Sequence, residues 1–501
     1  MKKSFRTRIL TLKIKTMNTN ILLFKLYHSL TIHAKNIAFQ LEEKTWTYQE
    51  LLAKSAAIRN AIREEKTSQS IGLHLSNDFE MYASLLAIWF EGKTYVPIHP
   101  EFPIKKVEKI LEQAECSCLI SSLPNSDELP TVKIIDSKNT IPTEFQEPNF
   151  VNENSNAYIL FTSGSTGEPK GVPITFSNLY HFTEAYYEAF GEISERDNVL
   201  QMFELNFDMS VVSYLIPWLN GAKMVGLHNK EVKFLQIMDL LEENKITVAQ
   251  LVPSIANLML PYLDPNIKNQ SLRSVFFAGE ALLEKTINEW RNFVPNATIY
   301  NAYGPTENTI ICSFYEIPWN APKQKNGILS IGKQMKNNTL RFLDDNTSEG
   351  ELLLGGHLLT PHYWKNPEKD REAFIEIDGN RYYKTGDWCE RDENQNYFYI
   401  NRIDFQTKIN GYRVELSEIE HFANQICKQG ICIALAVRDE NENDIIILVS
   451  DDDSVNTETI ANHLKNNIPN YMMPSKIVKM TSFPYTSSGK VDRKMLKNQF
   501  Q

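Results

Sequence analysis

Short apolar segments that are typical of strands alternate along this chain with segments of helical periodicity, and this alternation constrains the fold more than any other feature. In the N-terminal part, Ile71–Leu75 is predicted as a buried strand and Phe79–Glu91 as a helix. The same order recurs further on, with a strand at Ser274–Ala278, a helix at Leu282–Phe293 and a strand at Ala297–Tyr300. Helices that alternate with short apolar strands predict an α/β protein with parallel sheets.

A second, smaller unit is predicted after Asn401-Arg-Ile-Asp404, where the texture of the sequence changes. The 501 residues are too many for one hydrophobic core, so two or three domains are expected. The last part of the chain has its own predicted helix, Ser417–Gln425, and two predicted strands, Ile431–Val437 and Asp444–Val449. We therefore expect a large N-terminal domain over residues 17–403, with parallel or mixed sheets and flanking helices, and a small α+β C-terminal domain over residues 404–501.

The first sixteen residues, MKKSFRTRILTLKIKT, form a basic extension that we expect to be disordered. They interleave six basic residues with short apolar steps, whereas a secretory signal needs a continuous apolar block. An upstream start codon or a frayed basic tail explains residues 1–16 better than an arm that touches a membrane, and Met17 opens the first domain. No apolar run approaches the length that spans a bilayer.

Cysteine usage and charge narrow the compartment and the partners. The cysteines form no Cys-x-x-Cys pair and have no histidine at the spacing of a zinc site, so we interpret them as small buried residues in a reducing compartment, which favours a cytoplasmic location. They are Cys116, Cys118, Cys312, Cys389, Cys427 and Cys432. The net charge of −10 argues against general nucleic-acid binding, although Lys465–Gln501 carries seven basic residues against one acid.

A loop rich in glycine and hydroxyl groups follows a predicted strand at Tyr158–Phe161. The segment Thr162-Ser-Gly-Ser-Thr-Gly-Glu-Pro-Lys-Gly171 offers three glycines, four hydroxyls and Lys170, which are the groups that hold a polyphosphate. A flexible linker would not need the buried strand or the Pro-Lys-Gly end. A Walker loop would need Lys directly after its second glycine, but here Glu-Pro follows Gly167.

Four further segments follow this loop in an order that resembles the adenylate-forming superfamily, which comprises acyl-CoA ligases, luciferases and the adenylation domains of nonribosomal peptide synthetases. The segments are Asn301-Ala-Tyr-Gly-Pro-Thr-Glu307, Tyr383-Lys-Thr-Gly-Asp387, Asn401-Arg-Ile-Asp-Phe-Gln-Thr-Lys-Ile-Asn-Gly-Tyr-Arg413 and Ser488-Gly-Lys-Val-Asp-Arg493. The resemblance extends from Met17 to the C-terminus. It implies an enzyme that joins the carboxylate of its substrate to the AMP part of ATP.

The resemblance implies four roles in catalysis. Lys490 matches the lysine that assists adenylation, and Asp404 matches the hinge on which the small domain turns between two half-reactions. Thr306 is implied to face the α-phosphate, and Glu307 to hold Mg²⁺, because a carboxylate and phosphate oxygens suit a hard cation. ATP and Mg²⁺ are therefore the expected cofactors.

A second group of residues is implied to bind the nucleotide. Tyr303 would stack on adenine beside Asn301, and Asp387, with Arg402 near it, would accept hydrogen bonds from the ribose hydroxyls. The expected set is Thr162, Ser163, Gly164, Ser165, Thr166, Gly167, Lys170, Ala278, Gly279, Glu280, Asn301, Ala302, Tyr303, Gly304, Asp387 and Arg402.

An amino acid is the implied substrate, because Phe207-Asp-Met-Ser210 matches the segment in which amino-acid-activating members place an aspartate against the substrate ammonium group. The alternative for Asp208 is a helix N-cap. The implied substrate site consists of Asp208, Met209, Val212, Gln250, Phe276, Ala278, Ala302, Ile310 and Ile311. Since Asp208 is its only charged member, a small neutral amino acid is expected. The hinge and tail look similar to free-standing D-alanine–carrier-protein ligases, but those ligases carry Cys where this chain has Ala278.

The acceptor of the acyl group is expected to be a thiol on another protein. The chain has neither an Asp-Ser-Leu carrier motif nor a His-His pair of a condensation domain, so we expect transfer in trans to the phosphopantetheine of a separate carrier protein, from an enzyme that is a monomer. Carrier proteins are usually acidic, so the basic stretch Lys465–Gln501 is either their docking surface or an ordinary solvated face.

Two other functions stay open at this point. The first is an acyl-CoA or aryl-CoA ligase of the same fold, against which Asp208 argues because plain carboxylic acids carry no amine. The second is a non-catalytic nucleotide-binding scaffold, which would not need Lys490, Glu307 and Asp387 together.

Overall fold

The computed structural model describes residues 20–500 except 66–67, 124–131, 146, 150, 163–167, 229–231, 244, 265, 404–405, 441 and 486–490. Some predicted features therefore lie outside the described residues. These are the basic extension 1–16, the loop residues Ser163, Gly164, Ser165, Thr166 and Gly167, the hinge Asp404 and the lysine Lys490.

A nine-stranded sheet is the largest element of the N-terminal part, in the order β17-β14-β13-β12-β11-β9-β10-β1-β2. The strands from β13 to β1 in this order are parallel to one another, and antiparallel strands close both edges. The strands are β1 (Ile37–Leu41), β2 (Lys44–Thr47), β9 (Asn198–Gln201), β10 (Lys223–Gly226), β11 (Val248–Leu251), β12 (Ser274–Ala278), β13 (Thr298–Tyr303), β14 (Ser313–Glu316) and β17 (Lys333–Gln334).

A second, six-stranded sheet has the order β6-β5-β3-β4-β7-β8 and is parallel except for its last pair. Its strands are β3 (Ser70–His74), β4 (Thr94–Ile98), β5 (Cys118–Ser121), β6 (Lys133–Asp136), β7 (Asn156–Thr162) and β8 (Lys170–Thr175). The predicted phosphate loop connects β7 to β8, so Thr162 ends one strand and Lys170 begins the next.

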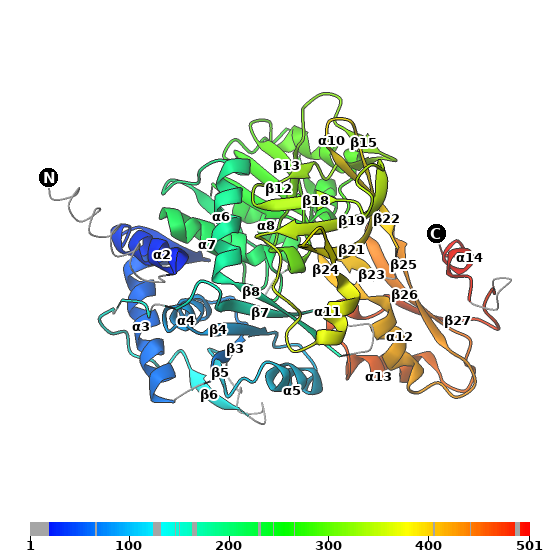
Figure 1. Cartoon of the computed structure of the whole chain (residues 1–501), viewed down its shortest axis with the longest axis horizontal. Coiled ribbons are helices and arrows are strands. Elements are labelled where there is room, and N and C mark those ends of the chain that lie inside the picture. The colour runs from blue at the N-terminus through cyan, green and yellow to red at the C-terminus, as the bar shows by residue number, and fades with distance from the viewer. Residues whose placement is uncertain are drawn as a thin grey trace.

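Helices cover these two sheets and join them in one core (Figure 1). Trp89 lies 5.8 Å from Tyr214 between ring centroids, so α4 beside the smaller sheet packs against α7 beside the larger one. The helices are α2 (Ile21–Ile32), α3 (Tyr48–Glu64), α4 (Phe79–Phe90), α5 (Ile104–Gln113), α6 (Phe176–Phe190), α7 (Met209–Asn220), α8 (Lys233–Glu243), α9 (Pro253–Met259), α10 (Glu284–Phe293) and α11 (Pro367–Ala373), with short turns η2 (Leu260–Tyr262) and η3 (Thr306–Asn308).

Local sequence signals explain how several helices begin and end. Thr47 and Glu50 form a capping box at the start of α3. Helix α4 ends just before Gly92, which has a φ of +75° that a glycine adopts without steric cost.

A third, antiparallel sheet has the order β18-β19-β21-β20, with β22 paired to β21. Its strands are β18 (Asn338–Arg341), β19 (Glu349–Gly356), β20 (Phe374–Ile377), β21 (Asn380–Arg391) and β22 (Tyr397–Arg402), and a short hairpin, β15 (Gln324–Lys325) and β16 (Ile328–Leu329), lies nearby. Strand β22 leads to the predicted hinge.

The C-terminal part has its own buried clusters, which include Ile409 to Met472 in one and Ile433 to Leu496 in the other. A hairpin, β23 (Gln406–Ile409) and β24 (Tyr412–Glu415), precedes a three-stranded sheet of β25 (Cys432–Arg438), β26 (Asp444–Ser450) and β27 (Lys476–Lys479). The remaining elements are α12 (Leu416–Asn424), α13 (Thr457–Lys465), η4 (Asn470–Met472) and α14 (Arg493–Lys497), grouped on one side of the molecule in Figure 1.

The expected fold class, a large α/β N-terminal domain with a smaller C-terminal domain, is confirmed. The domain boundaries at residues 17 and 404 stay predictions. All six cysteines are free, and all but Cys427 are buried. In the described part of the chain, the helices are too short or too polar to cross a membrane.

Candidate active site

A cavity of about 670 Å³ lies where the large N-terminal part meets the C-terminal part. Its inner wall comes from the carboxyl ends of the parallel strands β12 and β13, a position where open α/β sheets commonly bind ligands. Its outer wall comes from the β23–β24 hairpin, from β25 and from α14. The cavity therefore brings together residues from nearly the whole length of the sequence.

Asp208 lines this cavity at the N-terminal end of α7. The residue occupies the N-cap position, yet its side chain makes no cap hydrogen bond. Only 6% of the residue is exposed, and Oδ2 has no hydrogen-bond partner among the described residues. Burial raises the pKa of Asp208 to about 6, against the opposing effects of a hydrogen bond from Thr306 and of the Lys408 charge. A buried carboxylate oxygen of this kind requires a donor or a cation from a ligand.

A second carboxylate, Asp387, is held by two donors at the other end of the cavity. Tyr303 donates its hydroxyl to Oδ2 at 2.6 Å, and Arg402 Nη1 donates to Oδ1 at 2.8 Å. Arg402 reaches Asp387 because the two residues are directly opposite in the antiparallel pair β21–β22. Asn301 lines the same region and donates to the backbone oxygen of Ser330 at 2.8 Å.

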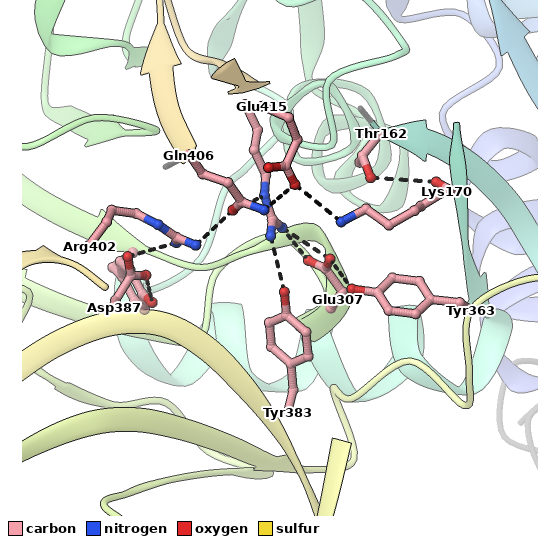
Figure 2. Close-up of polar contacts among 11 residues, drawn as sticks. Thr162, Lys170, Glu307, Tyr363, Tyr383, Asp387, Arg402, Gln406 and Glu415 are labelled. Carbon is pink, nitrogen blue, oxygen red and sulfur yellow. Dashed lines mark hydrogen bonds and ion pairs between the residues drawn. The ribbon is translucent and has the colours of Figure 1, made fainter. Parts of the chain in front are cut away.

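Glu307 is completely buried beside Thr306 at the cavity. Arg413 contacts both of its oxygens, at 2.8 and 3.0 Å, and Tyr363 donates a hydroxyl at 2.7 Å. Burial alone would raise the pKa of Glu307, but the charges of Arg413 and Lys170 outweigh burial and hold that pKa at about 2. Figure 2 shows Glu307 between Tyr363 and Tyr383, the latter a second partner of Arg413.

The cation Lys170 is paired at the same junction. Its Nζ lies 3.4 Å from Oε1 of Glu415, as Figure 2 shows, and Gln406 also donates to Glu415. Burial and the neighbouring Arg413 charge lower the pKa of Lys170. The lysine that follows the phosphate loop is thus bound by an acid of the C-terminal part.

The β23–β24 hairpin enters the cavity through its turn. The backbone N–H of Gly411 donates to Oε1 of Glu280 at 2.8 Å, and Glu280 also accepts from the backbone and hydroxyl of Ser254. Gly411 has a φ of +85°, and a Cβ there would lie 2.8 Å from Val252 Cγ1, so only glycine fits this approach.

Sequence reasoning did not assign Lys408, Arg413 and Glu415 to the site. Each lies in or beside the quoted segment 401–413, and the signal was available. Charged residues alternate there with the buried Ile409 and Val414, so the charged side chains of these short strands share the face opposite the core. Lys408 lines the cavity within electrostatic reach of Asp208 and Asp387, and burial lowers its pKa.

The predicted substrate residues divide into two layers. Met209, Ala278, Ala302 and Ile310 line the cavity with Asp208, as do the predicted nucleotide residues Gly279 and Gly304. Among the described residues, Val212, Gln250, Phe276 and Ile311 are buried without lining it. Gln250 accepts a hydrogen bond from Ser213 of α7 at 2.7 Å, so it lies between α7 and the sheet. The cavity thus ends at two alanines above a filled layer.

The outer part of the cavity is basic. Arg438, Arg493, Lys494 and Lys497 line it together with the β25 backbone around Leu435. Arg493 is paired with Glu420 at 2.7 Å. The basic stretch predicted as a docking surface therefore reaches the same cavity as Asp208.

The residues present fit a magnesium ion bound together with phosphate groups. No cluster of three or more potential metal ligands occurs within the described residues, so protein ligands alone do not form a metal site there. Glu307 is nevertheless a hard oxygen ligand, completely buried beside Thr306, and Mg²⁺ often binds through one or two carboxylates plus substrate phosphates.

The family model of AMP-binding enzymes matches residues 27–364. Zwittermicin A synthase ZmaJ of Bacillus cereus is 31% identical over 483 residues, which cover 92% of this chain and 91% of ZmaJ. Another relative of the same identity is much longer, and this chain spans 18% of its length.

Two solved structures share the fold over almost the whole chain. The adenylation domain AlmE of Vibrio cholerae, in complex with glycyl-adenosine-5′-phosphate, has a TM-score of 0.82 at 21% identity, covering 96% of this chain and 97% of AlmE. Holo-PA1221, a nonribosomal peptide synthetase protein with adenylation and PCP domains, has a TM-score of 0.83 at 22% identity, covering 95% of this chain and 84% of PA1221.

Proposed function

The chain belongs to the AMP-binding enzyme family, and we propose that it activates a small neutral amino acid with ATP and passes the aminoacyl group to the thiol of a separate carrier protein. The observation that carries the proposal is the free oxygen of Asp208. This carboxylate is buried, lines the cavity and has an oxygen without a partner among the described residues. A substrate ammonium group would supply the missing partner.

The energetic argument favours amino acids over plain carboxylic acids. A charge-assisted hydrogen bond between a partly buried aspartate and an ammonium group contributes about 1.5–3 kcal/mol. A carboxylic acid without the amine leaves the carboxylate of Asp208 buried and unpaired, which costs about as much again. The glycyl adenylate bound to AlmE is a molecule of the class proposed here.

The size of the side chain follows from the wall behind Asp208. Ala278 and Ala302 line the cavity, and Phe276 and Gln250 fill the space behind them. A side chain of one or two carbon atoms fits this depth, so alanine of either hand and other small neutral amino acids are the proposed substrates.

In the first half-reaction, an oxygen of the substrate carboxylate attacks the α-phosphorus of ATP, and the bond from that phosphorus to the bridging oxygen breaks. Pyrophosphate leaves and aminoacyl-AMP remains. Thr306 would donate to the α-phosphate, Lys490 would offset the negative charge that accumulates there, and Asp387 would orient the ribose. When bound, Mg²⁺ offsets charge on the phosphates, and Glu307 would hold it.

In the second half-reaction, the sulfur of a thiol attacks the carbonyl carbon and AMP leaves, while the thiol proton passes to solvent. The basic outer part of the cavity, with Lys494 and Lys497, suits the phosphodiester of a phosphopantetheine arm and the acidic surface of a carrier. A carrier domain accompanies the adenylation domain in PA1221. For this chain we propose a carrier in trans.

The test is amino-acid-dependent exchange of pyrophosphate into ATP, measured over all amino acids in both enantiomers and over matched carboxylic acids. We expect exchange with alanine or another small neutral amino acid. Exchange only with carboxylic acids that lack an amine would make the chain an acyl-CoA or aryl-CoA ligase. No exchange with any substrate, despite ATP binding, would favour the non-catalytic scaffold.

A further inference from the structure

Two ion pairs of opposite sense join the β24 strand to the proposed nucleotide site. Arg413 contacts both oxygens of Glu307, at 2.8 and 3.0 Å. Two residues further, Glu415 Oε1 lies 3.4 Å from Nζ of Lys170. Because alternate residues of a strand share a face, Arg413 and Glu415 present one cation and one anion side by side.

All four side chains are largely shielded from water. The exposed fractions are 16% for Arg413, 0% for Glu307, 12% for Lys170 and 8% for Glu415. Removing one partner of such a pair leaves the other charge buried and uncompensated, which is strongly unfavourable. Glu307 therefore needs a cation, and Lys170 an anion, in whatever state the cavity adopts.

The proposed nucleotide needs the same two groups. Mg²⁺ would take up the oxygens of Glu307, which Arg413 occupies through a two-pronged contact. A phosphate would take up Lys170, which Glu415 occupies. Gly411 is wedged against Val252 in the same hairpin, so the hairpin holds both side chains at the site together.

We propose that Arg413 takes the place of Mg²⁺ at Glu307 and that Glu415 takes the place of a phosphate at Lys170, so that the β23–β24 hairpin and magnesium pyrophosphate compete for one site. This inference rests on the proposed function. The competition couples the two half-reactions, since the hairpin enters as magnesium pyrophosphate leaves. It also keeps Glu307 and Lys170 paired throughout the cycle.

The first test is calorimetric binding of pyrophosphate to the full chain, with Mg²⁺ and with the metal removed by a chelator. Arg413→Gln should tighten binding of magnesium pyrophosphate by about tenfold, because the competing cation is gone. It should not tighten binding of metal-free pyrophosphate, since the unpaired charge of Glu307 repels that anion. A hairpin that is merely loosened would tighten both forms equally.

Two further variants complete this test. Glu415→Gln should tighten pyrophosphate binding with and without Mg²⁺, because it frees Lys170, and this near-isosteric change serves if Arg413→Gln does not fold. Arg196→Gln removes the same charge from an exposed turn that does not line the cavity, and it should bind like the wild type.

The second test reports the hairpin position without pyrophosphate affinity. Asn470 and Glu101 are exposed and face each other across the two parts of the chain, with Nδ2 and Oε2 at 3.0 Å. In a Glu101→Cys, Asn470→Cys variant under mild oxidation, magnesium pyrophosphate should slow disulfide formation about tenfold, and Arg413→Gln should slow it without any ligand.

The outcomes separate this inference from the proposed function. Tight magnesium pyrophosphate binding that Arg413→Gln and Glu415→Gln leave unchanged, with an unchanged disulfide rate, overturns the competition alone. Failure of the wild type to bind magnesium pyrophosphate or ATP overturns both proposals.

Discussion

Asp208 shows how one residue can hold a position for one reason and a side chain for another. Its backbone stands at the N-cap of α7, where an aspartate would ordinarily accept a hydrogen bond from the helix. Its side chain instead faces the cavity with one oxygen unpartnered among the described residues. Burial then raises its pKa, which makes the residue sensitive to pH near neutrality.

A pH dependence follows from this pKa. Burial raises the pKa of Asp208 to about 6, so below that pH the carboxyl gains a proton and loses the charge that binds the ammonium group. We expect kcat/KM for the amino acid to fall about tenfold per pH unit below that value. Pyrophosphate exchange between pH 5 and 7.5 measures it. Asp208→Asn should give a flat profile, and the same decline in that variant would assign the pH dependence to another group.

At the level of single residues, the sequence indicated which groups would gather but not how they pair. Tyr303 and Asp387 were both assigned to the nucleotide, and the structure joins the tyrosine hydroxyl to the carboxylate at 2.6 Å. The contact of Arg413 with Glu307 spans 106 positions of the sequence and depends on how two separate units meet. No local pattern encodes such a contact.

The secondary structure elements were the most predictable level. Strand β12 has the predicted bounds Ser274–Ala278, and α4 ends within one residue of the predicted Glu91, since Gly92 stops it. These elements follow from local periodicity and from the ends that glycine imposes. The insertion of the Gly411 turn beside Val252 could not be predicted, because it depends on tertiary approach rather than on propensity.

Helix α14 carries a prediction about the carrier. Lys494 and Lys497 line the outer part of the cavity, so reversing both charges should slow carrier loading about tenfold at low salt and less at high salt. Loading of a phosphopantetheinylated carrier, measured at several ionic strengths, tests this. The amino-acid-dependent exchange rate should change far less.

The matched control for this prediction is Lys465→Glu, an exposed residue of α13 in the same basic stretch. It should load the carrier at the wild-type rate. Equal slowing by Lys465→Glu, or no slowing by the double reversal at any ionic strength, would make the basic stretch an ordinary solvated face.

For the molecule as a whole, the two proposed half-reactions need different arrangements of the same cavity. Adenylation requires a cation at the α-phosphate, whereas the thiol must later reach the same carbonyl. The described contacts of the β23–β24 hairpin with Glu280 and Glu307 belong to one arrangement. Rotation of the C-terminal part at Asp404 would provide the other.

Variants of Lys490 and Asp404 should separate these steps. We expect Lys490→Ala to slow adenylate formation at least about a hundredfold while still permitting thiol transfer from supplied aminoacyl-AMP. Asp404→Pro, which restricts the hinge backbone, should impair the transfer more than the adenylation. Single-turnover rates of each half-reaction measure both effects, and loss of both steps in the same proportion in both variants would exclude the rotation.

The measurement that tests the central claim most directly compares the best amino acid with its analogue that lacks the amine, such as alanine with propionate, by pyrophosphate exchange. The wild type should prefer the amino acid by about tenfold or more in kcat/KM, and Asp208→Asn should lose most of that preference, since one decade corresponds to about 1.4 kcal/mol. Equal use of both substrates by the wild type, or an unchanged preference in Asp208→Asn, would contradict the assignment of Asp208 as the ammonium anchor of an amino-acid-activating enzyme.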